Sequence, residues 1–166
     1  WVEEFENYKQ FPEYQKINMG MSLAGFKAIF WYEFSHRLLG RAIGLVFAIP
    51  FIYFLVKRQV DQRLGLRLGA LFVLGGMQGV LGWYMVSSGL VDRPDVSQYR
   101  LTAHLGLAVL IYGYMIWLAM AVLIPMARPW GEAAPLGFRA ATYAIVGSVF
   151  VLILSGGLVA GLDAGF

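Results

Sequence analysis

The chain contains no cysteine, which excludes disulfides, thiolate metal sites and cysteine nucleophiles. Charged residues are also scarce. They make up 14% of the 166 residues, whereas about 25% is usual for a soluble domain. The net charge is only +3 and the basic residues are dispersed, which argues against a nucleic-acid-binding surface. Histidine occurs only twice, as His36 and His104.

Hydrophobic residues are abundant instead, at 59% of the chain with a mean hydropathy of +0.64. A helix needs about 20 apolar residues to cross the hydrocarbon core of a bilayer. Four segments meet this requirement, at about residues 38–56, 68–90, 101–127 and 138–162. The sequence therefore predicts an all-α integral membrane protein with four transmembrane helices.

The distribution of basic residues predicts how the spans are oriented. The loop at residues 57–67 carries four basic residues against one acidic residue, and the loop at 128–139 carries two arginines against one glutamate. Basic loops face the cytoplasm or matrix. The loop at 91–100, both ends of the chain and an interfacial segment at residues 1–37 are then expected on the opposite, outer side.

Both histidines fall at the outer ends of spans that run in the same direction. His36 directly precedes the first span, and His104 lies one turn inside the third. The two imidazoles are expected within about 5 Å of each other in depth, as a haem iron with two axial histidines requires. Two alternatives remain open. The histidines can hydrogen-bond neighbouring helices, or they can bind zinc with Glu33 as a third ligand.

Charged side chains surround His36. Glu33 is three residues before it and shares its helix face, so its carboxylate can orient the imidazole or transfer protons. The alternative for Glu33 is an ion pair with Arg37. Arg37, Arg41 and Arg100 can hold haem propionates in bidentate contacts. Arg37 and Arg100 can instead extend to lipid headgroups, whereas Arg41, within the apolar run, is the better candidate for burial.

Glycines four residues apart occur in the second and fourth spans, at Gly75 and Gly79 and at Gly157 and Gly161. Such spacing allows close helix packing. In the second span, a glycine-lined face can also admit a flat macrocycle.

Several longer motifs resemble one known family. They are Glu4–Tyr14, Phe26–Arg41 with its Glu-Phe-Ser-His-Arg core, Gln78–Leu90, Tyr99–Leu105 with Arg-Leu-Thr-Ala-His, and Ser155–Gly165. Together, and in this order, they resemble the haem A synthase family in its mitochondrial and alphaproteobacterial form. The resemblance covers nearly the whole chain.

This resemblance implies an eight-span protein built of two similar four-helix halves, each with two histidines for a haem. The chain would contain about spans two to five. Residues 1–37 form the outer interfacial segment, residues 38–127 three spans of the N-terminal haem-binding half, and residues 128–166 an inner loop and the first span of the C-terminal half. Such a piece alone is expected to be inactive.

The family oxidises the C8 methyl group of haem O to the formyl group of haem A, which serves cytochrome c oxidase. The resemblance implies that His36 and His104 flank the pocket for the substrate haem and that Glu33 is the acid needed for activity. It also implies a haem b in the other half that relays electrons.

The expected partners are haem O synthase, an electron donor such as ferredoxin, membrane lipid and a second copy of the chain in a homo-oligomer. The expected location is the bacterial plasma membrane or the mitochondrial inner membrane. The competing interpretations are a b-type cytochrome with bis-histidine haem that only carries electrons, and a haem-free transporter or assembly factor.

Overall fold

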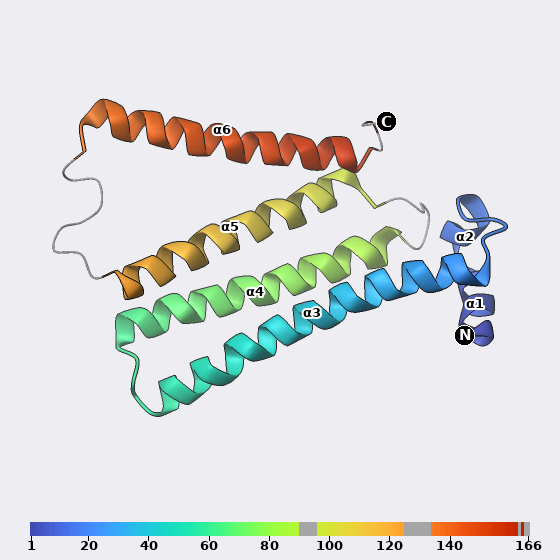
Figure 1. Cartoon of the computed structure of the whole chain (residues 1–166), viewed down its shortest axis with the longest axis horizontal. Coiled ribbons are helices and arrows are strands. Elements are labelled where there is room, and N and C mark those ends of the chain that lie inside the picture. The colour runs from blue at the N-terminus through green and yellow to red at the C-terminus, as the bar shows by residue number, and fades with distance from the viewer. Residues whose placement is uncertain (90–95, 125–133, 163, 165–166) are drawn as a thin grey trace. The chain divides into compact units, whose positions relative to one another are not determined.

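The computed structural model of the chain describes residues 1–89, 96–124, 134–162 and 164. This part of the chain consists of helices joined by turns, which confirms the predicted all-α class. The helices are α1 (Val2–Tyr8), α2 (Pro12–Lys16), α3 (Leu23–Val56), α4 (Gln62–Gly89), α5 (Gln98–Leu123) and α6 (Leu136–Ala160) (Figure 1). The predicted loop residues 91–95 and 128–133 lie outside the described residues, as does Leu90.

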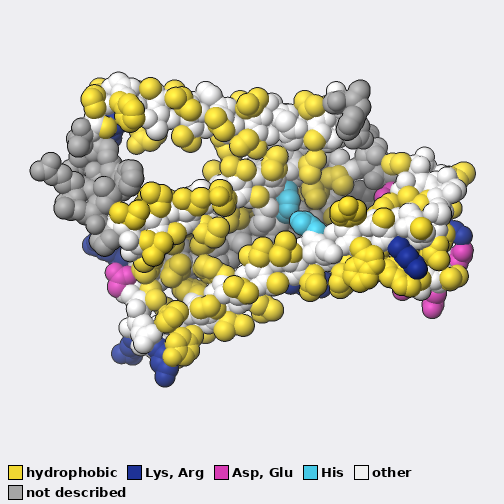
Figure 2. Space-filling model, in the orientation of Figure 1, with side chains coloured by type: hydrophobic (Ala, Val, Ile, Leu, Met, Phe, Trp, Pro, Cys, Tyr) yellow, Lys and Arg dark blue, Asp and Glu magenta, His cyan; other side chains and the backbone are white. Residues whose placement is uncertain are grey.

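Four of these helices are long and apolar enough to cross a membrane: α3, α4, α5 and α6. In each of these helices, at most 11% of the most apolar 18-residue window is buried by other described residues of the chain. Hydrophobic side chains cover the lengths of these helices, while acidic and basic side chains gather near the loop between α3 and α4 and on the N-terminal segment (Figure 2). Apolar surface of this extent is stable only in lipid or against further helices. The chain is a multi-pass membrane protein.

Helix α3 is longer than the predicted first span. It begins at Leu23, 15 residues before the expected start of the span, after Ser22 accepts a hydrogen bond from the backbone N–H of Gly25 at 3.2 Å. Its 34 residues correspond to about 51 Å, against about 30 Å for the hydrocarbon core. The last part of the predicted outer segment and the first span are therefore one continuous helix.

Trp1–Ser97 form one compact unit, in which α3 and α4 make an antiparallel hairpin (Figure 1). The Phe72 ring lies 6.2 Å from the ring of Phe47 and 6.4 Å from that of Phe51. At the turn, Arg58 adopts a positive φ of 54°, and the N–H groups of Arg58 and Gln59 donate to the last carbonyls of α3. This C-terminal cap ends α3 directly after its last apolar residue.

The short helices α1 and α2 pack against the start of α3. Phe5 and Phe26 are buried there, with ring centroids 5.2 Å apart. The rings of Tyr8 and Trp1 extend this aromatic cluster over Phe26 and Phe30. Gly20, with a φ of +85°, makes the left-handed turn that returns the chain from α2 to α3. The cluster fixes the part of α3 that carries Glu33 and the residues around it.

The second unit, Gln98–Phe166, contains α5 and α6 packed against each other. A Cβ atom added at Gly161 would lie 2.5 Å from the Cα atom of Gln98, and one added at Gly157 would lie 3.3 Å from that of Thr102. Only glycine allows this approach of two backbones. The prediction of tight packing is thus confirmed for the glycine pair of the fourth span.

Candidate functional site

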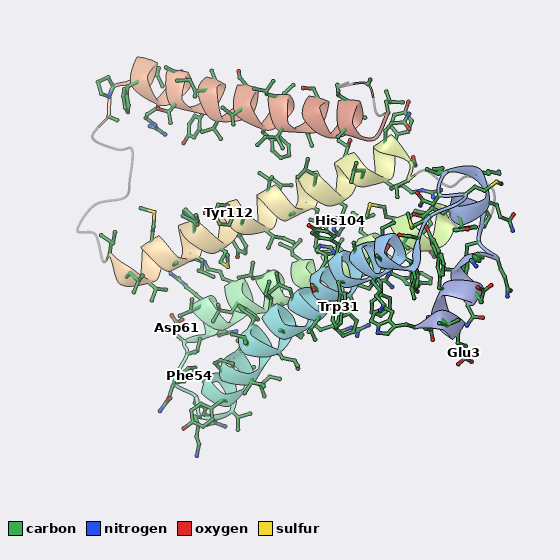
Figure 3. All side chains as sticks on the ribbon, turned by 45° about the vertical axis from the view of Figure 1, so that its right-hand side comes forward. Glu3, Trp31, Phe54, Asp61, His104 and Tyr112 are labelled. Atoms are coloured by element: carbon green, nitrogen blue, oxygen red, sulfur yellow. The ribbon has the colours of Figure 1, made fainter. Side chains whose placement is uncertain are left out.

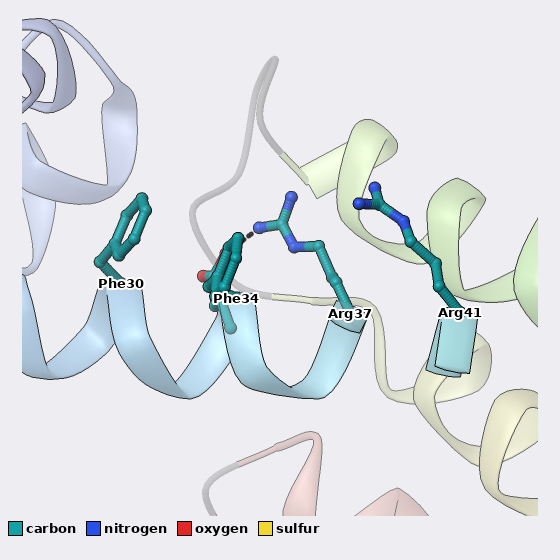
Figure 4. A pocket seen from close by; sticks show the side chains of 5 residues that line it. Phe30, Phe34, Arg37 and Arg41 are labelled. Carbon is teal, nitrogen blue, oxygen red and sulfur yellow. Dashed lines mark hydrogen bonds and ion pairs between the residues drawn. The ribbon is translucent and has the colours of Figure 1, made fainter. Parts of the chain in front are cut away.

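Glu33 and Arg37 face each other one turn apart on α3. The guanidinium of Arg37 donates to the Glu33 carboxylate, and this ion pair is drawn as a dashed line in Figure 4. The pairing that the sequence left open as an alternative for Glu33 is therefore present. Both side chains are about half exposed, so the pair contributes only a few tenths of a kcal/mol to stability. The pair therefore only biases the carboxylate toward Arg37.

His36 lies on the side of α3 that faces α4. At about 100° per residue, His36 falls on the same stripe as Gly40, Gly44 and Phe47, and Phe47 contacts α4 through Phe72. The imidazole is exposed and forms no hydrogen bond with any described residue. It is therefore available to coordinate a ligand from this stripe.

Beyond the phenylalanine contacts, the facing stripes of α3 and α4 carry glycines. Phe51 contacts Gly69, and Leu55 contacts Gly65, which sets the register of the two antiparallel helices. If this register continues along the helices, Gly44 lies level with Gly76 and Gly40 close to the level of Gly79. A Cβ atom added at any of these four glycines would meet no described atom within 4 Å. Side chains of the described residues therefore do not reach these four glycines, and His36 lies one turn before Gly40 on α3.

His104 and Arg100 lie one turn apart near the start of α5, and Figure 3 labels His104 on this helix. The contacts with α6 run through Gln98, Thr102 and Gly106. By helical geometry, His104 and Arg100 leave α5 roughly 150° away from that face. The Nδ1 atom of His104 is buried nonetheless. The α5–α6 contact thus fixes the helix without using these two side chains.

The structure describes His36 in the first unit and His104 in the second, and the meeting of the two imidazoles stays a prediction. Within neither unit do three His, Asp or Glu side chains among the described residues form a group that could hold a metal ion.

Arg37 and Arg41 line a pocket of about 180 Å³ together with Phe30, Glu33 and Phe34. Their role in binding propionates stays a prediction. Sequence reasoning did not include the two phenylalanines, although their spacing with the arginines along one side of a helix could have indicated a shared site.

A polar network in the outer segment was also missed. The amide of Asn18 donates to the Tyr8 hydroxyl at 2.8 Å and to the Glu13 carboxylate at 3.4 Å. Burial raises the pKa of both Tyr8 and Glu13, and the negative charge of Glu33 adds to each increase. Glu33 is therefore electrostatically coupled to a network that reaches the outer segment.

Comparisons with known proteins cover the whole chain. Residues 1–166 match the family described as cytochrome oxidase assembly protein. The chain is 56% identical to a protein of Nitrosospira multiformis, 50% to one of Nitrosomonas eutropha and 54% to one of Parvibaculum lavamentivorans, each named Heme A synthase.

Each alignment covers 99% of this chain and 46 to 47% of the relative, so the chain spans about half the length of the curated relatives it matches. No solved structure matches the chain. With a family match over every residue and half of the positions shared with these relatives, the chain belongs to the cytochrome oxidase assembly protein family that contains the haem A synthases.

Proposed function

We propose that the protein is a haem A synthase, a membrane oxidoreductase that converts the C8 methyl group of haem O to the formyl group of haem A. The observation that carries this proposal is the 50 to 56% identity, over 99% of the chain, to proteins named Heme A synthase. The chain supplies the N-terminal histidine pair and the catalytic carboxylate. The remaining length of the relatives accounts for the second half of the protein.

The residues present are suited to hold a haem. A flat macrocycle needs helix faces free of side chains, and Gly40 and Gly44 on α3 with Gly76 and Gly79 on α4 would offer such faces. His36 on the α4-facing stripe and the partly buried His104 would supply the axial nitrogens. Arg100 leaves α5 on the same side as His104 and would pair with a propionate.

Glu33 would serve as the proton acceptor. Oxidation of a methyl group to a formyl group proceeds through hydroxylation and the loss of water from a geminal diol, and it removes protons from the substrate. Glu33 shares a helix face with His36, and its half-exposed carboxylate is accessible to exchange protons there.

The other components follow from the same proposal. When bound, a haem b in the second half of the protein supplies one-electron transfer between the substrate site and an external donor such as ferredoxin. Haem O synthase would provide the substrate. The basic residues of the loop between α3 and α4 support a location of the N-terminal segment on the periplasmic or intermembrane side.

A Glu33→Ala variant of the intact protein tests the proposal against a b-type cytochrome that only carries electrons. We expect the variant to retain haem and to lose haem A formation, measured by chromatography of extracted haems. Glu6→Ala is the matched control, because Glu6 also forms an exposed ion pair on a helix, with Lys9, but outside the spans. Continued haem A formation in Glu33→Ala would contradict the assigned role.

A further inference from the structure

The pocket formed by Phe30, Glu33, Phe34, Arg37 and Arg41 faces mostly away from His36, and Glu33 is its lining residue nearest to the face of His36. At about 100° per residue, the Arg41 side chain leaves α3 roughly 140° around the helix from His36, and the side chain of Phe34 roughly 160°. Figure 4 shows Arg37 and Arg41 extending to the same side of the helix as the Phe30 ring. A ligand held by His36 against α4 would therefore lie on the other side of the helix body from Arg41.

Arg41 is a charge in an apolar span that the described residues leave uncompensated. It forms no hydrogen bond or ion pair with any of them, whereas Arg37 is paired with Glu33. The pocket thus carries two guanidinium groups against one carboxylate. A guanidinium has five donors, so Arg37 keeps several for a second acceptor after binding Glu33. This excess of positive charge favours one anionic ligand that both arginines contact.

The depth of the pocket corresponds to the headgroup level of a bilayer. Helix α3 ends at Val56, before Lys57 and Arg58. A hydrocarbon core of about 30 Å, or about 20 residues, then reaches back to about Arg37. Arg41 lies one turn inside this boundary, within the length over which an arginine side chain reaches the interface.

The apolar wall of the pocket distinguishes a lipid from a soluble anion. The rings of Phe30 and Phe34 are stacked at 5.8 Å with an interplanar angle of 8°. They line the pocket together with the two arginines and lie on the water side of them. The volume of about 180 Å³ is several times the volume that one water molecule takes up in the liquid, about 30 Å³. A phosphate on the arginines would have the rings beside its headgroup, and its acyl chains could follow the exposed side chains of Leu45 and Ile49 deeper in the span.

We propose that this pocket binds the phosphate of an anionic phospholipid at the Arg37 end of the apolar span in α3. The pocket shares Glu33 with the proposed function, but Arg41 leaves α3 on the other side of the helix from His36. Lipid retention and haem content, measured separately, therefore distinguish a failure of this proposal from a failure of the proposed function. Bidentate contacts from arginine explain why two arginines, and not a single lysine, occur here. A lipid bound here would hold the part of α3 that carries Glu33.

The test uses the intact protein in nanodiscs of phosphatidylcholine containing a small fraction of phosphatidylglycerol. After detergent extraction and washing, the phosphatidylglycerol retained per protein is measured by mass spectrometry, and the haem content by pyridine haemochrome. We expect Arg41→Gln to lower phosphatidylglycerol retention about tenfold, as the loss of one bidentate charged contact implies, with haem content unchanged. Arg139→Gln, at an exposed arginine near the start of α6, is the control and should retain lipid as the wild type does.

Three results would overturn the proposal. A loss of haem with lipid retention unchanged would assign Arg41 to a propionate, and no change in either would leave Arg41 without a specific ligand. Displacement of the lipid by millimolar inorganic phosphate would indicate a site for a soluble anion. If Arg41→Gln fails to fold, Arg41→Lys replaces it, because lysine keeps the charge and removes only the bidentate geometry. Arg41→Lys should still lower lipid retention, and unchanged lipid retention in this variant would refute the proposal.

Discussion

The close approach of α5 and α6 can be tested by adding one methyl group at Gly161. In Gly161→Ala, the new Cβ atom would lie 2.5 Å from the Cα atom of Gln98 and 2.7 Å from its Cβ atom. Carbon atoms in favourable contact lie about 3.5 to 4.0 Å apart. Since the obstacle includes backbone, no side-chain rotation relieves it, and the two helices must separate by about 1 Å.

Forced overpacking of this kind costs about 1 to 3 kcal/mol. Other glycines on the same two helices provide a graded series. At Gly157 the nearest backbone atom is 3.3 Å away, at Gly106 the close atom is the flexible end of Leu154, and at Gly147 no described atom lies within 4 Å. We expect the destabilisation by alanine to decrease in the order Gly161, Gly157, Gly106, with Gly147→Ala neutral or stabilising because alanine favours a helix by up to about 1 kcal/mol.

The assay is the thermal unfolding midpoint of the intact protein in detergent. One kcal/mol shifts the midpoint by about 2 to 4 °C for a protein of 150 to 250 residues, and by less for a longer chain. Because Gln98 is two residues before Arg100, we also expect Gly161→Ala to lower haem content. Equal midpoints for Gly161→Ala and Gly147→Ala would refute the described contact.

Three further predictions concern the other parts of the chain. Ser22→Ala removes the cap on the Gly25 N–H and should lower the free energy of unfolding by about 1 kcal/mol, measured by chemical denaturation, with Ser22→Asp as the conservative control. Burial gives Glu13 a higher pKa in the folded state than in the unfolded state, so the protein loses stability as the pH rises from the unfolded pKa through the folded pKa. Over this pH range the outer segment should become more sensitive to protease, and Glu13→Gln should abolish that pH dependence. His104→Ala in the intact protein should lose or weaken one of two haems and retain the other, and unchanged occupancy of both by pyridine haemochrome would contradict the ligand assignment.

Local relations within one helix were accessible from the sequence because helical spacing alone determines them. The three-residue separation of Glu33 and His36 places them on one face, and the four-residue separation of Glu33 and Arg37 allows the ion pair that the structure contains. Hydrophobicity likewise predicted the four spans. It did not predict that α3 begins at Leu23, because the aromatic and charged residues before Arg37 have the composition of an interfacial segment.

Relations between helices required the tertiary structure. The glycine pairs of the second and fourth spans have the same spacing, yet Gly157 and Gly161 contact α5 whereas Gly75 and Gly79 meet no described atom within 4 Å. Spacing indicates only that a helix can be approached closely, and the neighbouring helix decides whether it is. The pocket of Arg37 and Arg41 was likewise not evident, since the sequence grouped these residues with His36 by proximity along the chain.

The sequence by itself determined that this protein is helical and spans a membrane. In a bilayer every backbone N–H and C=O must be paired within the chain, and a long apolar segment meets that demand as a helix whatever its neighbours are. Only the tertiary structure decided which glycines bring backbones together, which glycines near His36 no described side chain reaches, and which residues line a pocket with Arg37 and Arg41. Those outcomes depend on how far each helix is rotated about its own axis, and that rotation is set by packing against the adjacent helix.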